Sequence, residues 1–441
     1  MTGASSIATC RYIRRPSGRS GTLTFDLSAL KWGVHGPIPA SGLSDQGKDL
    51  VEVSRVVHEV DRSMPRRITT ERTQKLSVAI AVREPEVWTA KAKEHLAQLL
   101  YVQGGAEWEF TFTKRKKTTT GLDELYAGQL GKRILIEPGT KNAVILFSGG
   151  LDSTSGLAAL QPDRKRCVLV GAFSRNLGNQ QAIAKTLGYP DLIQIQGVWN
   201  RAGGGAKVGG QFQHRSFYYL SLGAAFADAL RVETLYQFEN GPLALAVPPA
   251  PLYRMTRHAH PTVHREAEAL VAEVLRHSVT ILNPFLGKTK RQAVSVLLHA
   301  VPKKTLRKLL VRTETCWNIR ATSVVGAGPK DSKTPCGTCI PCIVRRTALG
   351  VGEKGYAVDL TSPNDANASK EVVRVHLNAY MTFARRVLSK DYGVGNLMRD
   401  MPEVTEVAIF EDRALTPEEA LGVYRTFASE ILDVFKKVDF R

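Results

Sequence analysis

A glycine-rich stretch, Ser148-Gly149-Gly150-Leu151-Asp152-Ser153, constrains the fold of this chain more than any other feature. It follows an apolar run over 143–147 and precedes a segment of helical character from Thr154 to Leu160. A strand that leads through a glycine turn into a helix brings hydroxyls, backbone N–H groups and the positive end of the helix dipole to one point. We therefore predict a loop that binds pyrophosphate. The alternative is a turn that needs glycine for its geometry alone.

The loop differs from two common nucleotide-binding motifs. No Lys-Ser or Lys-Thr pair closes it, as a Walker loop requires, and its glycines are adjacent, unlike those of a dinucleotide fingerprint. The sequence Gly287-Lys288-Thr289-Lys290 is similar to the end of a Walker loop, but Leu282 stands where its first glycine would be. Lys288 and Lys290 lie where a predicted strand meets a helix, so each could reach a bound phosphate or remain a solvated lysine.

From Asn142 the chain alternates predicted strands with predicted helices. This alternation predicts an α/β fold with a doubly wound parallel sheet, covered by helices on both faces. Ligands of such sheets bind at the carboxyl ends of the strands, and the glycine-rich loop directly follows the first strand. The predicted strands span 143–147, 167–173, 192–196, 234–238 and 279–283, and the helices lie near 154, 180, 216, 263 and 290.

The length of 441 residues predicts more than one domain. We expect residues 1–141 to form an N-terminal α+β accessory domain, with strands at 76–82 and 108–113 and a helix at 86–100. Residues 142–350 are the expected main domain, and 351–441 a C-terminal helical region with helices at 367–388 and 416–437. Residues 116–139 are expected to form a linker or hairpin. The glycines at 203–205 and 209–210 predict either a mobile lid or a permissive surface loop.

Four of the six cysteines are clustered. Cys336, Cys339 and Cys342 form two overlapping Cys-x-x-Cys units, and Cys316 lies twenty residues before the first of them. Four thiolates can complete the tetrahedral shell of a zinc ion, and Gly337 permits the tight knuckle that this shell needs. We predict a structural Zn²⁺ site. A redox dithiol, disulfides and an iron–sulfur cluster are the alternatives.

The formal net charge of +19 indicates affinity for polyanions, which include nucleic acid, nucleotides and acidic proteins. The densest basic runs are 114–117 and 303–312, and each could be a solvated surface or part of a nucleic-acid interface. No apolar stretch approaches the roughly 20 residues that span a bilayer. We therefore expect a cytoplasmic protein with no membrane contact.

The Ser-Gly-Gly-x-Asp-Ser loop and the arrangement Cys-x19-Cys-Gly-x-Cys-x-x-Cys-x-x-Arg, which ends at Arg345, together resemble the 7-cyano-7-deazaguanine synthases (QueC). These enzymes are a branch of the PP-loop ATP pyrophosphatases, and the resemblance covers residues 142–350. Arg215, at the start of a predicted helix, resembles the family's nucleotide-contacting arginine. Lys290 resembles the lysine that opens the helix after the fifth strand.

The resemblance implies that the protein activates a carboxylate. ATP is cleaved between its α- and β-phosphates, the acid becomes an acyl-adenylate, and pyrophosphate stays in the loop with Mg²⁺. In the family the acid is 7-carboxy-7-deazaguanine, and ammonia converts it to an amide that is then dehydrated to a nitrile. The residues that the resemblance makes catalytic are Asp152, Lys290 and Arg215. Those expected to bind ATP are Ser148, Gly149, Gly150, Leu151, Ser153, Thr154 and Arg345.

The chain departs from this family in two respects. Ordinary members are shorter and lack both residues 1–141 and the C-terminal region. After the fourth strand, Glu239-Asn240-Gly241 stands where the family carries Tyr-Pro-Asp-Cys-Arg, so these residues could contact the deazaguanine or could simply end the strand. Longer chains of this build are associated with bacterial antiviral defence, where the amine could belong to a partner protein of the same operon. The alternatives are an RNA base-modifying enzyme and a non-catalytic nucleotide-binding subunit of a defence complex.

Overall fold

The chain forms two compact units, each built from several chain segments. The computed structural model describes residues 7–14, 20–63, 74–116, 121–127, 134–172, 177–199, 213–250, 255–313, 316, 334–350, 355–360, 371–400 and 415–436. The first unit comprises residues 1–148, 161–237 and 256–283, and the second comprises 149–160, 238–255 and 284–441. The predicted division at 141 and 350 stays a prediction, and the glycines at 203–205 and 209–210 lie outside the described residues.

The first unit contains a six-stranded sheet in which the five predicted strands are confirmed as parallel neighbours. Their apolar runs are buried on both faces, as parallel strands under helices must be. A sixth strand was not predicted: it comes from the N-terminal segment and pairs antiparallel with the edge of the sheet. The order is β12 (Thr280–Leu282), β11 (Thr234–Gln237), β8 (Ala143–Leu146), β9 (Cys167–Ala172), β10 (Leu192–Trp199) and β3 (Leu30–His35).

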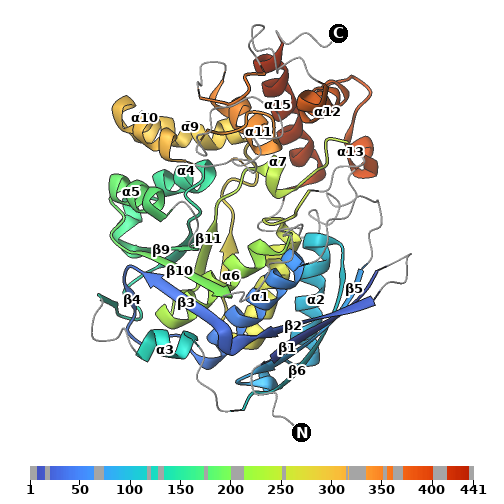
Figure 1. The fold of residues 1–441 in the computed structure, drawn as a ribbon. Helices are drawn as coiled ribbons and strands as arrows, with labels where there is room; N and C mark the ends of the chain where they lie inside the picture. The colour runs from blue at the N-terminus through green and yellow to red at the C-terminus, as the bar shows by residue number, and fades with distance from the viewer. Residues whose placement is uncertain are drawn as a thin grey trace. The chain divides into compact units, whose positions relative to one another are not determined.

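Helix α6 (Arg215–Leu230) packs against β8, β9 and β11 in this sheet and also against α1 (Asp45–Ser63). Almost every residue of α6 is buried, because it lies between the sheet and a further layer of helices (Figure 1). Helices α5 (Leu177–Leu187) and α8 (Pro261–Leu275) contact β10 and β12 respectively. The first unit is therefore a mixed α/β structure with a largely parallel sheet.

A second, four-stranded sheet confirms the strands and helix predicted for the N-terminal part. Its outer pair β5–β6 is parallel and is joined by α2 (Ala90–Gly104), whereas β1 pairs antiparallel with β2 and β5. The predicted linker contains α3 (Gly121–Ala127) and β7 (Leu135–Ile136), and β7 pairs with β4 (Ile38–Pro39). The sheet order is β2 (Ser20–Asp26), β1 (Ile7–Arg14), β5 (Gln74–Val82) and β6 (Glu107–Lys114).

The described part of the second unit is helical. Helix α9 packs against α4, α10 and α11, and α15 packs against α7, α11, α12 and α13 (Figure 1). The two helices predicted for the C-terminal region are confirmed as α12 and α15. Within the described residues, no helix is both long and apolar enough to span a membrane. The helices are α4 (Leu151–Ala159), α7 (Gly241–Ala244), α9 (Lys290–Ala300), α10 (Lys303–Arg312), α11 (Ile340–Leu349), α12 (Glu371–Val387), α13 (Val394–Asp400) and α15 (Pro417–Phe435).

Candidate functional site

The glycine-rich stretch forms the turn between strand β8 and helix α4. Gly149 has a φ of +74°, a left-handed conformation that disfavours any residue with a Cβ atom. Gly150 is the extended N-cap residue, and the helix begins at Leu151. The first N–H groups of a helix have no partner within it, so this turn presents donors and a positive dipole end at its glycines. The predicted glycine turn at a helix start is therefore confirmed, and its binding of pyrophosphate stays a prediction.

The polar side chains that follow the turn are buried. The Ser153 hydroxyl donates to the Gly150 carbonyl at 3.1 Å, which keeps the turn closed. Thr154 is fully buried, yet its Oγ1 has no hydrogen-bond partner among the described residues. Asp152 Oδ1 is likewise buried and unpartnered there. Because a buried polar atom without a partner costs free energy, two such atoms at one turn indicate a place for a polar ligand.

Asp152 and Lys290 form a buried ion pair within the second unit. The Lys290 ammonium donates to Asp152 Oδ2, and the two residues are 4% and 6% exposed. Burial raises the pKa of Asp152 to about 7, although Lys290 opposes this shift and Glu239 adds to it. The structure therefore joins two residues, predicted as catalytic, that lie 138 positions apart in the chain.

A capping box fixes the start of helix α9, where Lys290 is the first helical residue. The Thr289 hydroxyl accepts from the Gln292 N–H at 3.2 Å, and the Thr289 N–H donates to Gln292 Oε1 at 2.8 Å. Lys288, the second lysine considered above, is exposed. The structure therefore distinguishes the two lysines: Lys290 is held at the loop, and Lys288 faces solvent.

Glu239, Asn240 and Gly241 lie beside this ion pair. Asn240 is fully buried, and its Nδ2 donates to Asp152 Oδ2 at 3.1 Å and to Glu239 Oε1 at 2.8 Å. Gly241 donates its N–H to the Lys288 carbonyl at 2.8 Å, and a Cβ there would overlap the Leu286 carbonyl. Their described contacts therefore support the loop, and their contact with a deazaguanine stays a prediction.

Two other predicted residues have surroundings of a different kind. Arg215 is the first residue of α6 in the first unit, exposed, with its guanidinium 5.8 Å from the Tyr219 ring centroid. Arg345 is buried and donates to the Thr313 carbonyl at 3.0 Å and the Leu310 carbonyl at 3.0 Å, at the end of α10. These bonds give Arg345 a role in holding helix α10, and its contact with ATP stays a prediction.

The four clustered cysteines converge on one point. Their Sγ atoms all lie within 4.8 Å of one another, and the Cys316–Cys339 and Cys336–Cys342 pairs are both 3.9 Å apart. A tetrahedral zinc ion with bonds of about 2.3 Å would place sulfur atoms about 3.8 Å apart. The group could therefore hold a metal ion such as zinc. Sulfurs this close leave room for one ion, whereas a cluster must fit several iron and sulfide atoms between them.

The backbone around the cysteines is shaped for thiolates. The N–H groups of Thr338 and Cys339 both donate to Cys336 Sγ at 3.4 Å, and the Cys336 N–H donates to Cys316 Sγ at 3.3 Å. Cys339 is the N-cap of α11, where the helix dipole favours negative charge. Gly337 has a φ of +81°, and a Cβ there would overlap the Val358 carbonyl. This confirms the expected need for glycine at the knuckle.

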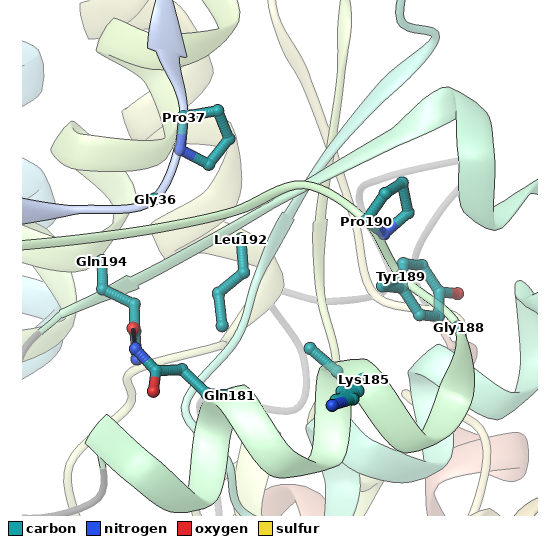
Figure 2. Close-up of a pocket in the computed structure, with 10 residues that line it drawn as sticks. Gly36, Pro37, Gln181, Lys185, Gly188, Tyr189, Pro190, Leu192 and Gln194 are labelled. Atoms are coloured by element: carbon teal, nitrogen blue, oxygen red, sulfur yellow. Dashed lines mark hydrogen bonds between the residues drawn. The ribbon is translucent and has the colours of Figure 1, made fainter. Parts of the chain in front are cut away.

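A cavity of about 510 Å³ lies in the first unit beside the start of β10 and the last turns of α5 (Figure 2). None of the predicted site residues lines it. A chain of amides leads from its wall to the residue before the glycine-rich stretch: Gln181 donates to Gln194 at 3.0 Å, Gln194 to Gln180 at 2.7 Å, and Gln180 to the Phe147 carbonyl at 3.0 Å. This network fixes the backbone directly before Ser148.

The basic run at 114–117 is buried at one position, Arg115, whereas Lys114 and Lys116 are exposed, so both alternatives for the run stay predictions. Arg115 is 6% exposed and donates to Glu52 Oε2 at 2.7 Å and to the Ala81 carbonyl at 2.9 Å. It therefore ties β6 to helix α1 instead of facing solvent or a nucleic acid. Lys117 lies outside the described residues. The second run forms α10 and exposes all its basic side chains: Lys303, Lys304, Arg307, Lys308 and Arg312.

One residue beside the site was missed by the sequence reasoning. Glu430 of α15 is 7% exposed and accepts from the Thr289 hydroxyl at 2.8 Å. It lies among the buried positions Phe427, Ile431 and Val434 of the same helix. An acidic residue on the apolar face of a predicted helix is the signal that could have identified it.

Comparison with protein-family models and with curated proteins gives no match for this chain. The described residues provide a glycine turn at a helix start, a buried carboxylate paired with a lysine, two buried oxygens without partners among them, and a separate group of four thiols.

Proposed function

We propose that this protein is an ATP-dependent ligase that adenylates a carboxylate and transfers the acyl group to an amine. The observation that carries the proposal is the turn at 149–150, where Asp152 Oδ1 and Thr154 Oγ1 are buried with no partner in the part of the chain that the structure describes, and where Lys290 is directed at Asp152. A glycine turn at a helix start binds phosphate oxygens, and the lysine supplies a fixed positive charge next to it. The sequence resemblance supports a 7-deazaguanine carboxylate as the acid.

The reaction proceeds in two steps, adenylation of the acid and transfer of its acyl group to the amine. An oxygen of the substrate carboxylate attacks the α-phosphorus of ATP, the bond to the bridging oxygen breaks, and pyrophosphate leaves. The amine nitrogen then attacks the acyl carbon of the adenylate, so that a carbon–nitrogen bond forms, AMP leaves and the amine gives up a proton. Lys290 neutralises the charge that develops on the departing pyrophosphate. Asp152, which also accepts from the Asn240 amide, holds Lys290 in place before ATP arrives.

The site also fits Mg²⁺. Asp152 Oδ1 is a carboxylate oxygen with no partner among the described residues, and nucleotide sites hold this ion with one or two carboxylates and the substrate phosphates. When bound, the ion would add positive charge to the phosphate site. Asp152 is the residue that would hold it.

The test is to incubate the protein with Mg-ATP and 7-carboxy-7-deazaguanine, with ammonium or a candidate partner protein, and to follow AMP and product masses. We expect AMP release, which Asp152→Ala should abolish. Asp163→Ala, which removes an exposed carboxylate from the first unit, should leave it unchanged. A mass increment on the partner would identify conjugation, and a free nitrile would identify synthesis. No AMP with any of these amines, despite ATP binding, would overturn the proposal in favour of a non-catalytic nucleotide-binding subunit.

For the four cysteines we propose a structural Zn²⁺ site, consistent with a reducing cytoplasm. Four sulfur ligands leave no open coordination position, so the ion stabilises the fold around α11 and takes no part in the reaction. The purified protein should contain one equivalent of zinc, measured by elemental analysis. Cys339→Ser should lose it, whereas Cys167→Ala should retain it. Iron with visible absorbance in the purified protein would contradict this assignment.

A second candidate function is supported by α10. This helix exposes five basic side chains on ten residues, an arrangement that suits contact with phosphates of RNA. A PP-loop enzyme that modifies an RNA base would bind RNA with an affinity that falls steeply with salt. Filter binding of total tRNA at several salt concentrations tests this function. The double variant Lys304→Glu/Lys308→Glu should flatten the salt dependence if α10 is the contact.

A further inference from the structure

The C-terminal helix α15 contacts two of the three stretches of chain that carry the second-unit site residues: the one around Lys290 and the one around Asn240. At one segment, Glu430 accepts from the hydroxyl of Thr289, the residue directly before Lys290, and Arg291 lies 3.7 Å from Asp433. At the other, the Tyr424 hydroxyl donates to the Pro242 carbonyl at 3.4 Å. One helix therefore holds the start of α9 and the start of α7.

The bond between Glu430 and Thr289 is not needed to cap α9. The Thr289 oxygen already accepts from the Gln292 N–H, and the Gln292 side chain closes the capping box. The capping box satisfies the helix end without help from α15. The additional bond fixes the Thr289 hydroxyl to α15, and through it the first turn of α9.

Glu430 lies at a position where a carboxyl group is energetically unfavourable. It lies on the buried face of α15, where an apolar side chain would avoid the cost of burying a carboxyl group. Burial raises the pKa of Glu430, and its Oε2 has no hydrogen-bond partner among the described residues. One hydrogen bond to a neutral hydroxyl does not offset this cost, so packing alone does not explain the residue.

We propose that Glu430 is a positioning residue of the phosphate site: through Thr289 it fixes the first turn of α9, and so directs Lys290 at Asp152 and at bound pyrophosphate. The inference rests on the proposed function of the loop at 148–153. It makes α15 part of the catalytic apparatus, although no residue of this helix was predicted to take part.

The experiment compares two substitutions at this position by titrating inorganic pyrophosphate with Mg²⁺ in a calorimeter. Glu430→Gln keeps an oxygen that accepts from Thr289, whereas Glu430→Met keeps the length of the side chain without any acceptor. Methionine suits the apolar neighbours, so the variant should fold, which its thermal midpoint will show. Glu418→Met, an exposed position in the same helix, is the matched control.

We expect Glu430→Met to weaken pyrophosphate binding about tenfold and to slow AMP formation by a similar factor. The reason is that Lys290, once displaced, no longer points at the bound pyrophosphate. Glu430→Gln and Glu418→Met should both bind within about twofold of the unmodified protein. Unchanged affinity in Glu430→Met, or equal losses in the Met and Gln variants, would overturn the inference. Absence of pyrophosphate binding by the unmodified chain would instead overturn the proposed function.

Discussion

Asp152 and Lys290 are both more than nine-tenths buried, so neither side chain can return to water when its partner is removed. Removing one member of a buried pair typically costs about 3–5 kcal/mol. We therefore expect Lys290→Met to lower the free energy of unfolding by about 3 kcal/mol and to slow AMP release at least ~100-fold. Urea denaturation and an AMP assay measure the two effects.

Lys288→Met is the control for this prediction. Lys288 lies two positions earlier and is exposed, so its removal should change neither stability nor the rate. A Lys290→Met protein that releases AMP at the normal rate would contradict the role given to Lys290, even if its stability falls as expected.

The buried side chain of His58 predicts how the free energy of unfolding depends on pH. It is 9% exposed and stacks on Tyr218, with ring centroids 6.2 Å apart and an interplanar angle of 2°. Burial, with Arg55 as the next cause, lowers the pKa of His58 well below its usual value. Below about pH 6.5 the unfolded chain binds a proton that the folded protein does not. The free energy of unfolding must then fall as the pH decreases, by up to about 1.4 kcal/mol per pH unit.

We expect His58→Phe to keep the stacking on Tyr218 and to remove this contribution. Urea denaturation of both proteins at pH 7.5, 6.5, 5.5 and 5.0 measures it. The variant should lose less stability than the unmodified protein between pH 6.5 and 5.0. Parallel curves over that range would show that His58 is protonated as readily in the folded protein as in the unfolded chain.

Two helical glycines, Gly156 and Gly422, differ in the space that surrounds them. A Cβ at Gly156 in α4 would overlap the Phe238 ring, whereas one at Gly422 in α15 would meet nothing within 4 Å. Alanine is the better helix former by about 1 kcal/mol at either position. We expect Gly156→Ala to lose about 1–3 kcal/mol of stability through overpacking and Gly422→Ala to gain about 0.5–1 kcal/mol. Urea denaturation of both variants tests the opposite signs, and stabilisation by Gly156→Ala would contradict the packing of α4.

Local sequence was sufficient to predict some of the elements, among them the strands of the parallel sheet, but not their distant partners. The strands of the parallel sheet were predicted because burial on both faces leaves an apolar run in each. Strand β3 was not, because its place depends on β10, far along the chain. For the same reason the bond between Thr289 and Glu430, 141 positions apart, had no local signal that named its partner. That Asp152 and Lys290 belong to one site was anticipated only through a family resemblance, which carries long-range information that periodicity lacks; their direct contact was not predicted.

At the scale of the whole molecule, each unit is built from segments that are not contiguous in the chain. The second unit is assembled from residues 149–160, 238–255 and 284–441, so the chain enters and leaves the first unit more than once. The predicted site residues Asp152, Asn240 and Lys290 come one from each of these segments. The first two of these segments are joined to the first unit at both ends, and the third is joined to it at residue 284.

This arrangement predicts that residues 142–350, the part covered by the resemblance, do not fold as an isolated fragment. The fragment lacks β3 at the sheet edge, and it lacks α12 and α15, whose buried rings Phe383, Tyr424 and Phe427 belong to the core of the second unit. We expect it to aggregate or to give a far-ultraviolet circular dichroism spectrum of low helix content, and to bind no pyrophosphate. Co-expression with residues 351–441 should improve its solubility, because that piece restores the apolar face that α15 provides. A soluble 142–350 fragment that binds pyrophosphate as tightly as the full chain would show that α15, and Glu430 with it, is dispensable for the geometry of the site.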